Sequence, residues 1–463
     1  MTCVFYVNNV QKTIKNDIFV MKYLTFYDNM LIFAQSIKQT LTMKTIRRMT
    51  FLLVAVMLSM QAGAIDIKLK KDRTAVDGIT YSLNAKKQIA TVVKGQEPYV
   101  GDITIPNKIE VDSVTLYVED IASGAFKDCT GLTSINIPNC ITKIGSSAFE
   151  GCTSLTEVTI PEKITELPSD LFKNCSSLTT VILPENIKKL GNSMFKGCKS
   201  LVEFEIPEGV SEIPNSLFED CSELRNVVFP SGVRKFGNSV FENCSSLEYL
   251  DMPTGVGSVG NELFKNCNSL KEFHFPSGLS TISDNMFRNC VDLKYVEMSN
   301  SISKIEHDAF NGCTSLDSIY LNNSISAIGS SAFEGCASLQ AIRIPNGIKE
   351  ISGSVFKNCA SLKSINLPNS LLKIGSNAFE GCSSLTSITL PVSLKEIGGN
   401  AFDKCTSLMD IYSPSANPVK ISGSSFSKAT MKEGIVHVKK GFATNYNLDK
   451  QWKNFLNIIN MKE

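Results

Sequence analysis

Residues 132–154 read LTSINIPNCITKIGSSAFEGCTS, and this 23-residue pattern recurs along most of the chain. Thirteen cysteines mark the pattern, one every 23 residues from Cys129 to Cys405, and each has a Phe three residues before it and a Leu three residues after it. Self-similarity at a fixed period of this length indicates one structural unit copied in tandem. The sequence therefore predicts a solenoid with one continuous core rather than several separate domains.

Within one unit, the spacing of Ile135 and Ile137 by two predicts a strand whose alternate side chains point inward. Pro138 ends this strand, because proline has no amide to donate to a ladder. Gly145 then marks a turn, and residues 146–152 are predicted to form a short helix. A single coil buries too little apolar surface to offset the entropy of ordering it, so equivalent strands are expected to pair in parallel between neighbouring coils.

The recurring Phe, Cys and Leu positions are expected to form the interior. Stacked coils bring equivalent cysteines within disulfide distance, but their Cβ vectors then point side by side rather than toward each other. We therefore expect buried, reduced cysteines that pack as small apolar side chains, with disulfides in an exported protein as the alternative. In two successive units the predicted core positions are Phe149, Cys152, Leu155, Phe172, Cys175 and Leu178.

Charge and motif content exclude several classes of function. Lys and Arg total 46 against 45 Asp and Glu, without a basic run, so no nucleic-acid partner is expected. A zinc site needs four converging ligands, whereas the cysteines are spread along an axis, and His274, His307 and His437 share no register. No phosphate-binding loop or nucleophile elbow is present. We expect no catalytic residue, no metal site and no cofactor.

The N-terminal region predicts export. Residues 43–64 combine basic residues, the apolar run 51–60 and a small-residue cleavage site that ends at Ala64, as in a secretory signal peptide. The run is about half the roughly 20 residues that a membrane span needs, so the mature chain is expected to have no transmembrane segment. Residues 1–42 are expected to precede the natural start at Met43 as a start-codon artefact, with a disordered extension as the alternative.

Both ends are expected to cap the solenoid of residues 118–412, about 13 repeats of 23 residues, because terminal coils expose apolar faces. Residues 65–117 contain alternating apolar runs and predict an N-terminal β cap. Residues 413–463 lose the register and are expected to form a strand at 435–438 and a partly helical closing segment around Trp452. An unrelated small domain at either end is the alternative.

The motif L-x-x-I-x-I/L-P-x-x-I-x-x-I-G-x-x-A-F-x-x-C resembles the BspA-like leucine-rich repeat, a bacterial class, over residues 101–412. The resemblance implies an α/β repeat solenoid: a curved, right-handed coil with a parallel β-sheet on its concave face and short helical or 3-10 segments on the other side. It also implies export to the surface or exterior of a bacterium. Members of the family are implicated in adhesion to host matrix proteins, such as fibronectin and fibrinogen, and to other cells. The chain shows no bacterial immunoglobulin-like domain and no surface-sorting tail, so a periplasmic location is the alternative.

The variable positions lie between the buried ones. Side chains at positions 134 and 136, and at their equivalents every 23 residues, are expected to face out of the sheet. They are mostly small and polar in early and late repeats, but aromatic and acidic in the central ones. Tyr and Arg are enriched where interfaces carry their energy, and exposed tyrosines can stack on sugars; the alternative is ordinary cross-strand decoration of a sheet. The predicted ligand-binding residues are Glu205, Tyr249, Asp251, His274, Tyr295, Glu297, Tyr320 and Arg343.

The same central repeats depart from the consensus. Ser299 and Asn322 stand where proline is expected, and Ser283 and Glu306 stand where glycine or proline is usual. These departures predict a local rearrangement where the strands end.

The predicted function is that of an exported, adhesin-like binding protein whose partner is an extracellular protein, such as a host matrix protein, or a glycan. A structural surface or envelope component whose rods associate laterally is the second interpretation. An enzyme with its chemistry in an end segment is the third. The sequence predicts no oligomeric state.

Overall fold

The computed structural model describes residues 73–462. The predicted signal peptide, the segment before it and the first residues of the predicted N-terminal cap lie outside the described residues. Among residues 73–462, no helix is both long and apolar enough to cross a membrane.

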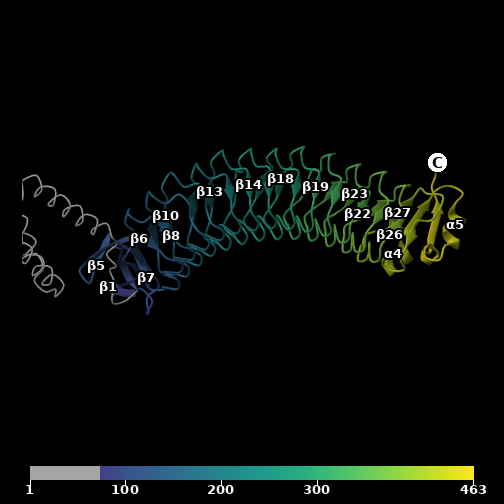
Figure 1. Cartoon of the computed structure of the whole chain (residues 1–463). Helices are drawn as coiled ribbons and strands as arrows, with labels where there is room; N and C mark the ends of the chain where they lie inside the picture. The colour runs from purple at the N-terminus through teal and green to yellow at the C-terminus, as the bar shows by residue number, and fades with distance from the viewer. Residues whose placement is uncertain (1–72, 463) are drawn as a thin grey trace, which may run out of the picture. The chain divides into compact units, whose positions relative to one another are not determined.

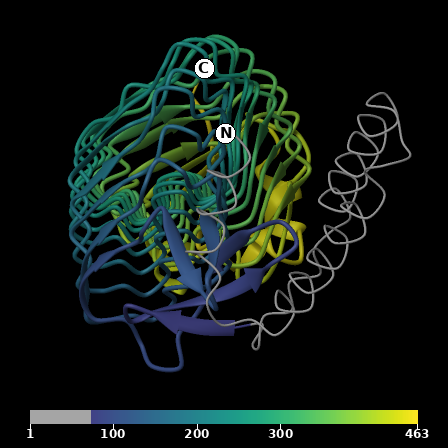
Figure 2. The same cartoon turned by 60° about the vertical axis from the view of Figure 1, so that its left-hand side comes forward.

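The repeats form a β-solenoid in which equivalent residues of successive coils stack directly on one another (Figure 1). Glu203 lies opposite Asn226 and Phe204 opposite Val227 in a parallel pair, so the register between coils equals the sequence period. This register confirms the predicted tandem stacking. The coils follow one another in the same orientation when the molecule is viewed toward its N-terminal strands (Figure 2).

Each coil carries up to two short strands. The first follows the Leu position and includes the predicted strand; we call the set of these strands the first ladder. Its members are β7 (Leu132–Asn136), β9 (Glu157–Thr159), β10 (Thr180–Ile182), β11 (Glu203–Glu205), β13 (Asn226–Val228), β16 (Glu272–His274), β18 (Tyr295–Glu297), β21 (Ala341–Arg343), β23 (Ser364–Asn366), β25 (Ser387–Thr389) and β27 (Asp410–Ser413).

A second ladder of two-residue strands was not predicted. It begins at β8 (Lys143–Ile144), directly before the turn at Gly145. Its other members are β12 (Glu212–Ile213), β14 (Lys235–Phe236), β15 (Ser258–Val259), β17 (Thr281–Ile282), β19 (Lys304–Ile305), β20 (Ala327–Ile328), β22 (Glu350–Ile351), β24 (Lys373–Ile374), β26 (Glu396–Ile397) and β28 (Lys420–Ile421).

The predicted short helix at residues 146–152 is wrong. The segment is a run of turns in which the Glu150 amide donates to the Ser147 carbonyl, while the Phe149 amide donates to Leu171 in the next coil. Ser147 and Gly151 have φ values of 56° and 77°, in the left-handed region, which breaks a right-handed helix. Pairing between coils therefore uses the amides that a helix would need, and the solenoid is built from strands and turns.

The predicted core is confirmed. Phe149 and Phe172 are fully buried, and their rings stack with centroids 5.6 Å apart and planes 10° from parallel. The row continues in the same manner, with Phe172 and Phe195 5.8 Å apart. Because the interior is closely packed, each coil is held mainly by the aromatic and aliphatic side chains of the coils on either side.

The cysteines at the repeated positions are buried, as predicted, and they also donate hydrogen bonds. The Cys152 thiol donates to the Phe126 carbonyl of the preceding coil at 3.1 Å. Burial raises the pKa of the Cys405 thiol to about 12. These side chains therefore remain neutral donors in the core and link neighbouring coils.

The N-terminal described segment forms a sheet in the order β1-β2-β3-β6-β5, which β8 of the solenoid joins through β6. A further strand, β4, pairs in parallel with β7 of the first ladder. The purple and blue strands lie at one end of the stack in both views (Figures 1 and 2). The bounds are β1 (Arg73–Val76), β2 (Ile79–Asn84), β3 (Ile89–Val92), β4 (Gly101–Thr104), β5 (Lys108–Val111) and β6 (Val114–Ile121).

After β27, the chain continues the first ladder with a different local structure. Strand β29 (Ile435–Val438) pairs with β27, and β30 (Asn457–Asn460) pairs with β29, both in parallel. The intervening elements are helices α4 (Lys428–Glu433) and α5 (Ala443–Leu448) and the 3-10 turn η1 (Trp452–Asn454). Trp452 is fully buried, and its indole N–H donates to the Val419 carbonyl at 2.7 Å.

Candidate binding surface

The first ladder presents one row of inward and two rows of outward side chains. In β16, Phe273 is 1% exposed, whereas Glu272 and His274 on either side are exposed. This alternation recurs in most of the three-residue strands. We call the outward side chains at positions 134 and 136, and their equivalents to 410 and 412, the exposed strand surface. All eight predicted ligand-binding residues lie on it and are exposed to solvent.

The ladder beneath this surface is interrupted in two coils. No strand is assigned at residues 249–251 or 318–320, although the strands of the coils on either side are present. The sheet expected from the family resemblance is instead a series of short parallel pairs in the described repeats, followed by the four-stranded sheet β25-β27-β29-β30 at the C-terminal end. Tyr249 and Tyr320, two of the three predicted tyrosines, lie on the interrupted coils.

The eight residues do not converge on one site. His274 Nδ1 lies 2.7 Å from a Glu297 carboxylate oxygen, and the His274 ring packs beside Tyr295 with centroids 5.9 Å apart. The Lys271 ammonium nitrogen lies over the Tyr249 ring, 5.6 Å from the ring centroid. These side chains are already engaged with neighbours on the same surface, as in ordinary cross-strand pairing.

Tyr320 and Arg343 differ from the others. Tyr320 is 67% exposed, the largest exposure of the three tyrosines. Within residues 73–462, neither side chain makes a hydrogen bond, an ion pair or a ring contact with another residue. Together with Tyr295 and Glu297, they line a hollow of about 560 Å³. The central part of the predicted surface therefore holds an aromatic ring and a guanidinium group that are available to a ligand.

Glu205 belongs to a separate hollow of about 800 Å³ nearer the N-terminus. Three other carboxylates, those of Glu185, Glu203 and Glu208, line it as well. Asp251 lies on one of the interrupted coils, between this hollow and the His274 pair. The surface therefore has an acidic part in the early coils and a mixed aromatic and basic part in the later ones.

Another hollow, of about 530 Å³, adjoins the one around Tyr320 and Arg343. Sequence reasoning missed it. It is lined by residues just before the strands, among them Gln340 and Lys363, and by serines that precede them. The signal was present, because these residues also repeat with the sequence period. The predicted outward positions of the repeat are 134 and 136, whereas position 133 is also exposed.

A cluster of Asp410, Tyr412 and His437 lies at the C-terminal end of the exposed strand surface. His437 Nε2 is 2.7 Å from an Asp410 carboxylate oxygen, and the His437 ring stacks on Tyr412 with centroids 4.5 Å apart. Asp410 and Tyr412 occupy the repeat positions, but His437 comes from β29, outside the sequence register. Only the pairing of β27 with β29 brings the histidine to this surface.

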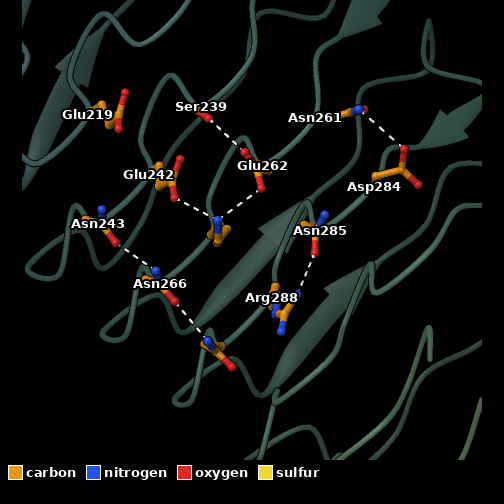
Figure 3. Close-up of polar contacts among 12 residues, drawn as sticks. Glu219, Ser239, Glu242, Asn243, Asn261, Glu262, Asn266, Asp284, Asn285 and Arg288 are labelled. Atoms are coloured by element: carbon orange, nitrogen blue, oxygen red, sulfur yellow. Dashed lines mark hydrogen bonds and ion pairs between the residues drawn. The ribbon is translucent and has the colours of Figure 1, made fainter. Parts of the chain in front are cut away.

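Polar side chains of successive coils form hydrogen-bonded rows away from the exposed strand surface. The side-chain carbonyl of Asn215 accepts the Asn238 amide at 2.8 Å, and Asn238 accepts the Asn261 amide in the same way. Asn261 then donates to Asp284, as Figure 3 shows. The figure also shows a second row, in which Asn266 donates to Asn243 at 2.7 Å.

The first of these rows ends in three residues of the types that bind metal ions. Donor atoms of Asp284, Glu306 and His307 lie within 4.8 Å of one another. However, Asp284 accepts the His307 backbone N–H and the Asn261 side chain, and His307 Nδ1 accepts the Ser330 amide. These hydrogen bonds join Asp284 and His307 to the coils on either side, so the group continues the polar row.

The consensus departures are also accommodated by hydrogen bonds. Asn322 is 3% exposed, and its side-chain amide donates to the Ser299 carbonyl at 3.0 Å. Ser299 in turn lies 2.7 Å from the Ser301 hydroxyl. Replacing proline thus adds a polar link between two coils. The turn itself keeps its backbone hydrogen bond, since the Ile302 amide donates to the Ser299 carbonyl as the Ile141 amide does to Pro138, so the predicted local rearrangement is not seen in this turn.

Comparisons with known proteins identify the repeat. The family model described as the BspA type leucine-rich repeat region, in 6 copies, matches residues 119–248, 237–362 and 349–441. A leucine-rich repeat protein from Bacteroides ovatus has a similar structure, with a TM-score of 0.66, 28% sequence identity, and coverage of 84% of this chain and 100% of that one. A leucine-rich cell surface protein from Faecalibacterium prausnitzii has a TM-score of 0.51 and 26% identity, with coverage of 74% and 94%. No curated protein was found to match.

Proposed function

The chain belongs to the BspA-type leucine-rich repeat proteins, and from this premise we propose that it is a non-enzymatic, adhesin-like binding protein of the bacterial surface. Its partner is an extracellular protein or a glycan, held on the exposed strand surface. The similarity to a leucine-rich cell surface protein supports the location. Solenoids of this kind use their extended surfaces for binding, while the core only supports the coils.

The observation that carries the proposal is the hollow around Tyr320 and Arg343. A large aromatic ring and a guanidinium group are exposed there without partners in the described chain. Such residues carry much of the energy at protein interfaces. An exposed row that served only the stability of the sheet would pair its large side chains with one another, as His274 and Tyr295 do.

The direct test begins with a ligand screen of the purified chain against matrix proteins and a glycan array. The double variant Tyr295→Ala/Tyr320→Ala should then weaken binding of the ligand found by at least about tenfold, since hot-spot truncations typically cost about 2 kcal/mol or more. Tyr117→Ala is the control, because Tyr117 is 52% exposed but lies on β6, away from the hollow. Unchanged affinity in the double variant, with folding intact, would remove the surface from consideration.

The proposed location requires export by residues 43–64. Protein recovered from outside the cytoplasm should begin at Ile65, as measured by mass spectrometry of its N-terminal peptide. An N-terminus upstream of Met43 in the exported protein would contradict this. Sedimentation that shows lateral self-association, together with an empty ligand screen, would favour the structural envelope role instead.

A further inference from the structure

The two central hollows form one continuous surface. The first hollow includes Ser318, Ala341 and Ser364, and the second includes the residue directly before each of them, Asp317, Gln340 and Lys363. Equivalent strands of adjacent coils are about 4.8 Å apart, so the joint surface extends roughly 20 Å along the stack. A ligand on it would therefore contact several coils at once.

This joint surface has two cations without acidic partners. Arg343 lies in the first hollow and Lys363 in the second, and within residues 73–462 neither forms an ion pair. Lys294 lies 4.0 Å from Asp317, and a Glu297 carboxylate oxygen lies 2.7 Å from His274 Nδ1. The lining of the two hollows therefore has three cationic side chains, Lys294, Arg343 and Lys363, against two carboxylates, Asp317 and Glu297. The joint surface thus has an excess of positive charge, whereas in the early coils Glu203 and Glu205 form no ion pair within residues 73–462.

The lining also has hydroxyl and amide groups. Ser338, Ser361 and Gln340 line the second hollow, and Asn366 lines the first, together with apolar side chains such as Met298 and Ala341. The apolar positions between them, such as Ile342, point into the core and are 5% exposed. The surface therefore offers hydrogen bonds and a stacking face, but no desolvated apolar pocket of the kind in which a protein partner anchors its side chains.

We propose that the joint surface binds an acidic polysaccharide, with sugar rings on Tyr320 and Tyr295 and their acidic groups at Arg343 and Lys363. This inference rests on the proposed function, of which it names the ligand class. A single exposed ion pair contributes little, so a polymer that presents acidic groups repeatedly along several coils fits better than a single anion. The acidic groups are carboxylates or sulfates, and both have the charge that the two cations require.

The test uses the full chain and three immobilised polymers: hyaluronate, which carries carboxylates, chondroitin sulfate, which carries both groups, and neutral dextran. We expect binding to at least one acidic polymer, none to dextran, and weaker binding as salt is raised. Binding to hyaluronate identifies the carboxylate as sufficient, and binding to chondroitin sulfate alone identifies the sulfate. The variant Arg343→Ala/Lys363→Ala should lose at least about tenfold in affinity, as two charge contacts of about 1 kcal/mol each imply.

The matched control is Arg225→Ala/Lys143→Ala, which removes the same charge. Arg225 is exposed at the same repeat position as Lys363, but in the acidic early coils, and Lys143 lies on the second ladder. An equal loss in the control would show non-specific attraction and overturn the site. Failure to bind either acidic polymer, or tighter binding of polyglutamate than of both, would overturn the polysaccharide. A protein ligand lost in Tyr295→Ala/Tyr320→Ala but unaffected by Arg343→Ala/Lys363→Ala would leave the proposed function intact while refuting this inference.

Discussion

The thiol of Cys175 donates a hydrogen bond to the carbonyl oxygen of Phe149, 26 residues earlier in the chain, at 3.0 Å. The same bond joins Cys244 to Phe218 and Cys290 to Phe264. The repeated cysteine therefore satisfies a buried carbonyl of the preceding coil, in addition to filling space. Each of these carbonyls also accepts the backbone amide of the residue three positions later, so the thiol is its second donor. A hydrogen bond of this kind contributes about 0.5–1.5 kcal/mol, which explains why a small side chain with a donor suits this position.

Replacing Cys244 by Ala should lower the free energy of unfolding by about 1–3 kcal/mol, because the Phe218 carbonyl loses one of its two donors and a small cavity remains. The other donor is the Cys221 backbone amide, which the substitution leaves in place. Chemical denaturation followed by circular dichroism measures this change. Cys140→Ala is the comparison, since Cys140 is only partly buried, and its cost should be smaller. An equal or larger cost at Cys140 would contradict the role assigned to the ladder thiols.

Stability should fall at alkaline pH. Burial raises the pKa of the Cys221 and Cys405 thiols, the latter to about 12. Because the unfolded thiols ionise from about pH 8.5 while the buried ones stay protonated, the unfolded state binds fewer protons, and stability is lost as the pH rises. Each such thiol should cost about 1 kcal/mol by about pH 9.5. Urea unfolding at several pH values tests this, and a variant with several ladder cysteines replaced by Ala should show a shallower loss.

The aromatic row should be sensitive to cavities. Phe264 is fully buried and stacks on Phe287 with centroids 5.5 Å apart. Phe264→Ala should cost about 3–5 kcal/mol, and Phe264→Leu should cost less because it leaves a smaller cavity. The midpoint of thermal or urea unfolding gives both values. Similar costs for the two substitutions would indicate that the stacked ring geometry, rather than the filled volume, stabilises the core.

Substitutions at two glycines with different surroundings would test how closely the coils approach each other. A Cβ atom added at Gly191 would lie 2.2 Å from the Pro168 carbonyl carbon of the preceding coil, whereas one at Gly232 would meet nothing within 4 Å. Gly191→Ala should therefore destabilise the protein by about 1–3 kcal/mol, and Gly232→Ala should be nearly neutral. Equal stability of the two variants would mean that the coils can separate at Gly191 without cost.

Short-range patterns predicted the buried positions better than they predicted local conformation. The period placed Phe172 and Cys175 in the core and Tyr320 on the surface, and all three lie there. The helix predicted at residues 146–152 was wrong, because the backbone amides of this segment donate to carbonyls of the next coil. A local helical pattern in the sequence contains no information about such bonds between coils. The second ladder was missed for the same reason, since two residues such as those of β8 carry no strand signal of their own.

The candidate surface was predicted only as a set of outward positions. Which members have partners depends on side-chain contacts between coils. The outward repeat positions of Tyr249 and Tyr320 therefore could not show that Tyr249 lies beside Lys271 while Tyr320 has no partner within residues 73–462. His437 was unpredictable, because it reaches Asp410 through the pairing of β29 outside the repeat.

The amino-acid sequence by itself determined the tandem coil, its register and its core, because a strict period forces equivalent side chains to stack. The tertiary structure alone decided where the strands are interrupted and which carbonyl accepts each thiol hydrogen bond. It also decided that Arg343 and Lys363 have no acidic partner among residues 73–462. These features depend on distances between neighbouring coils, and a linear pattern contains no such distances.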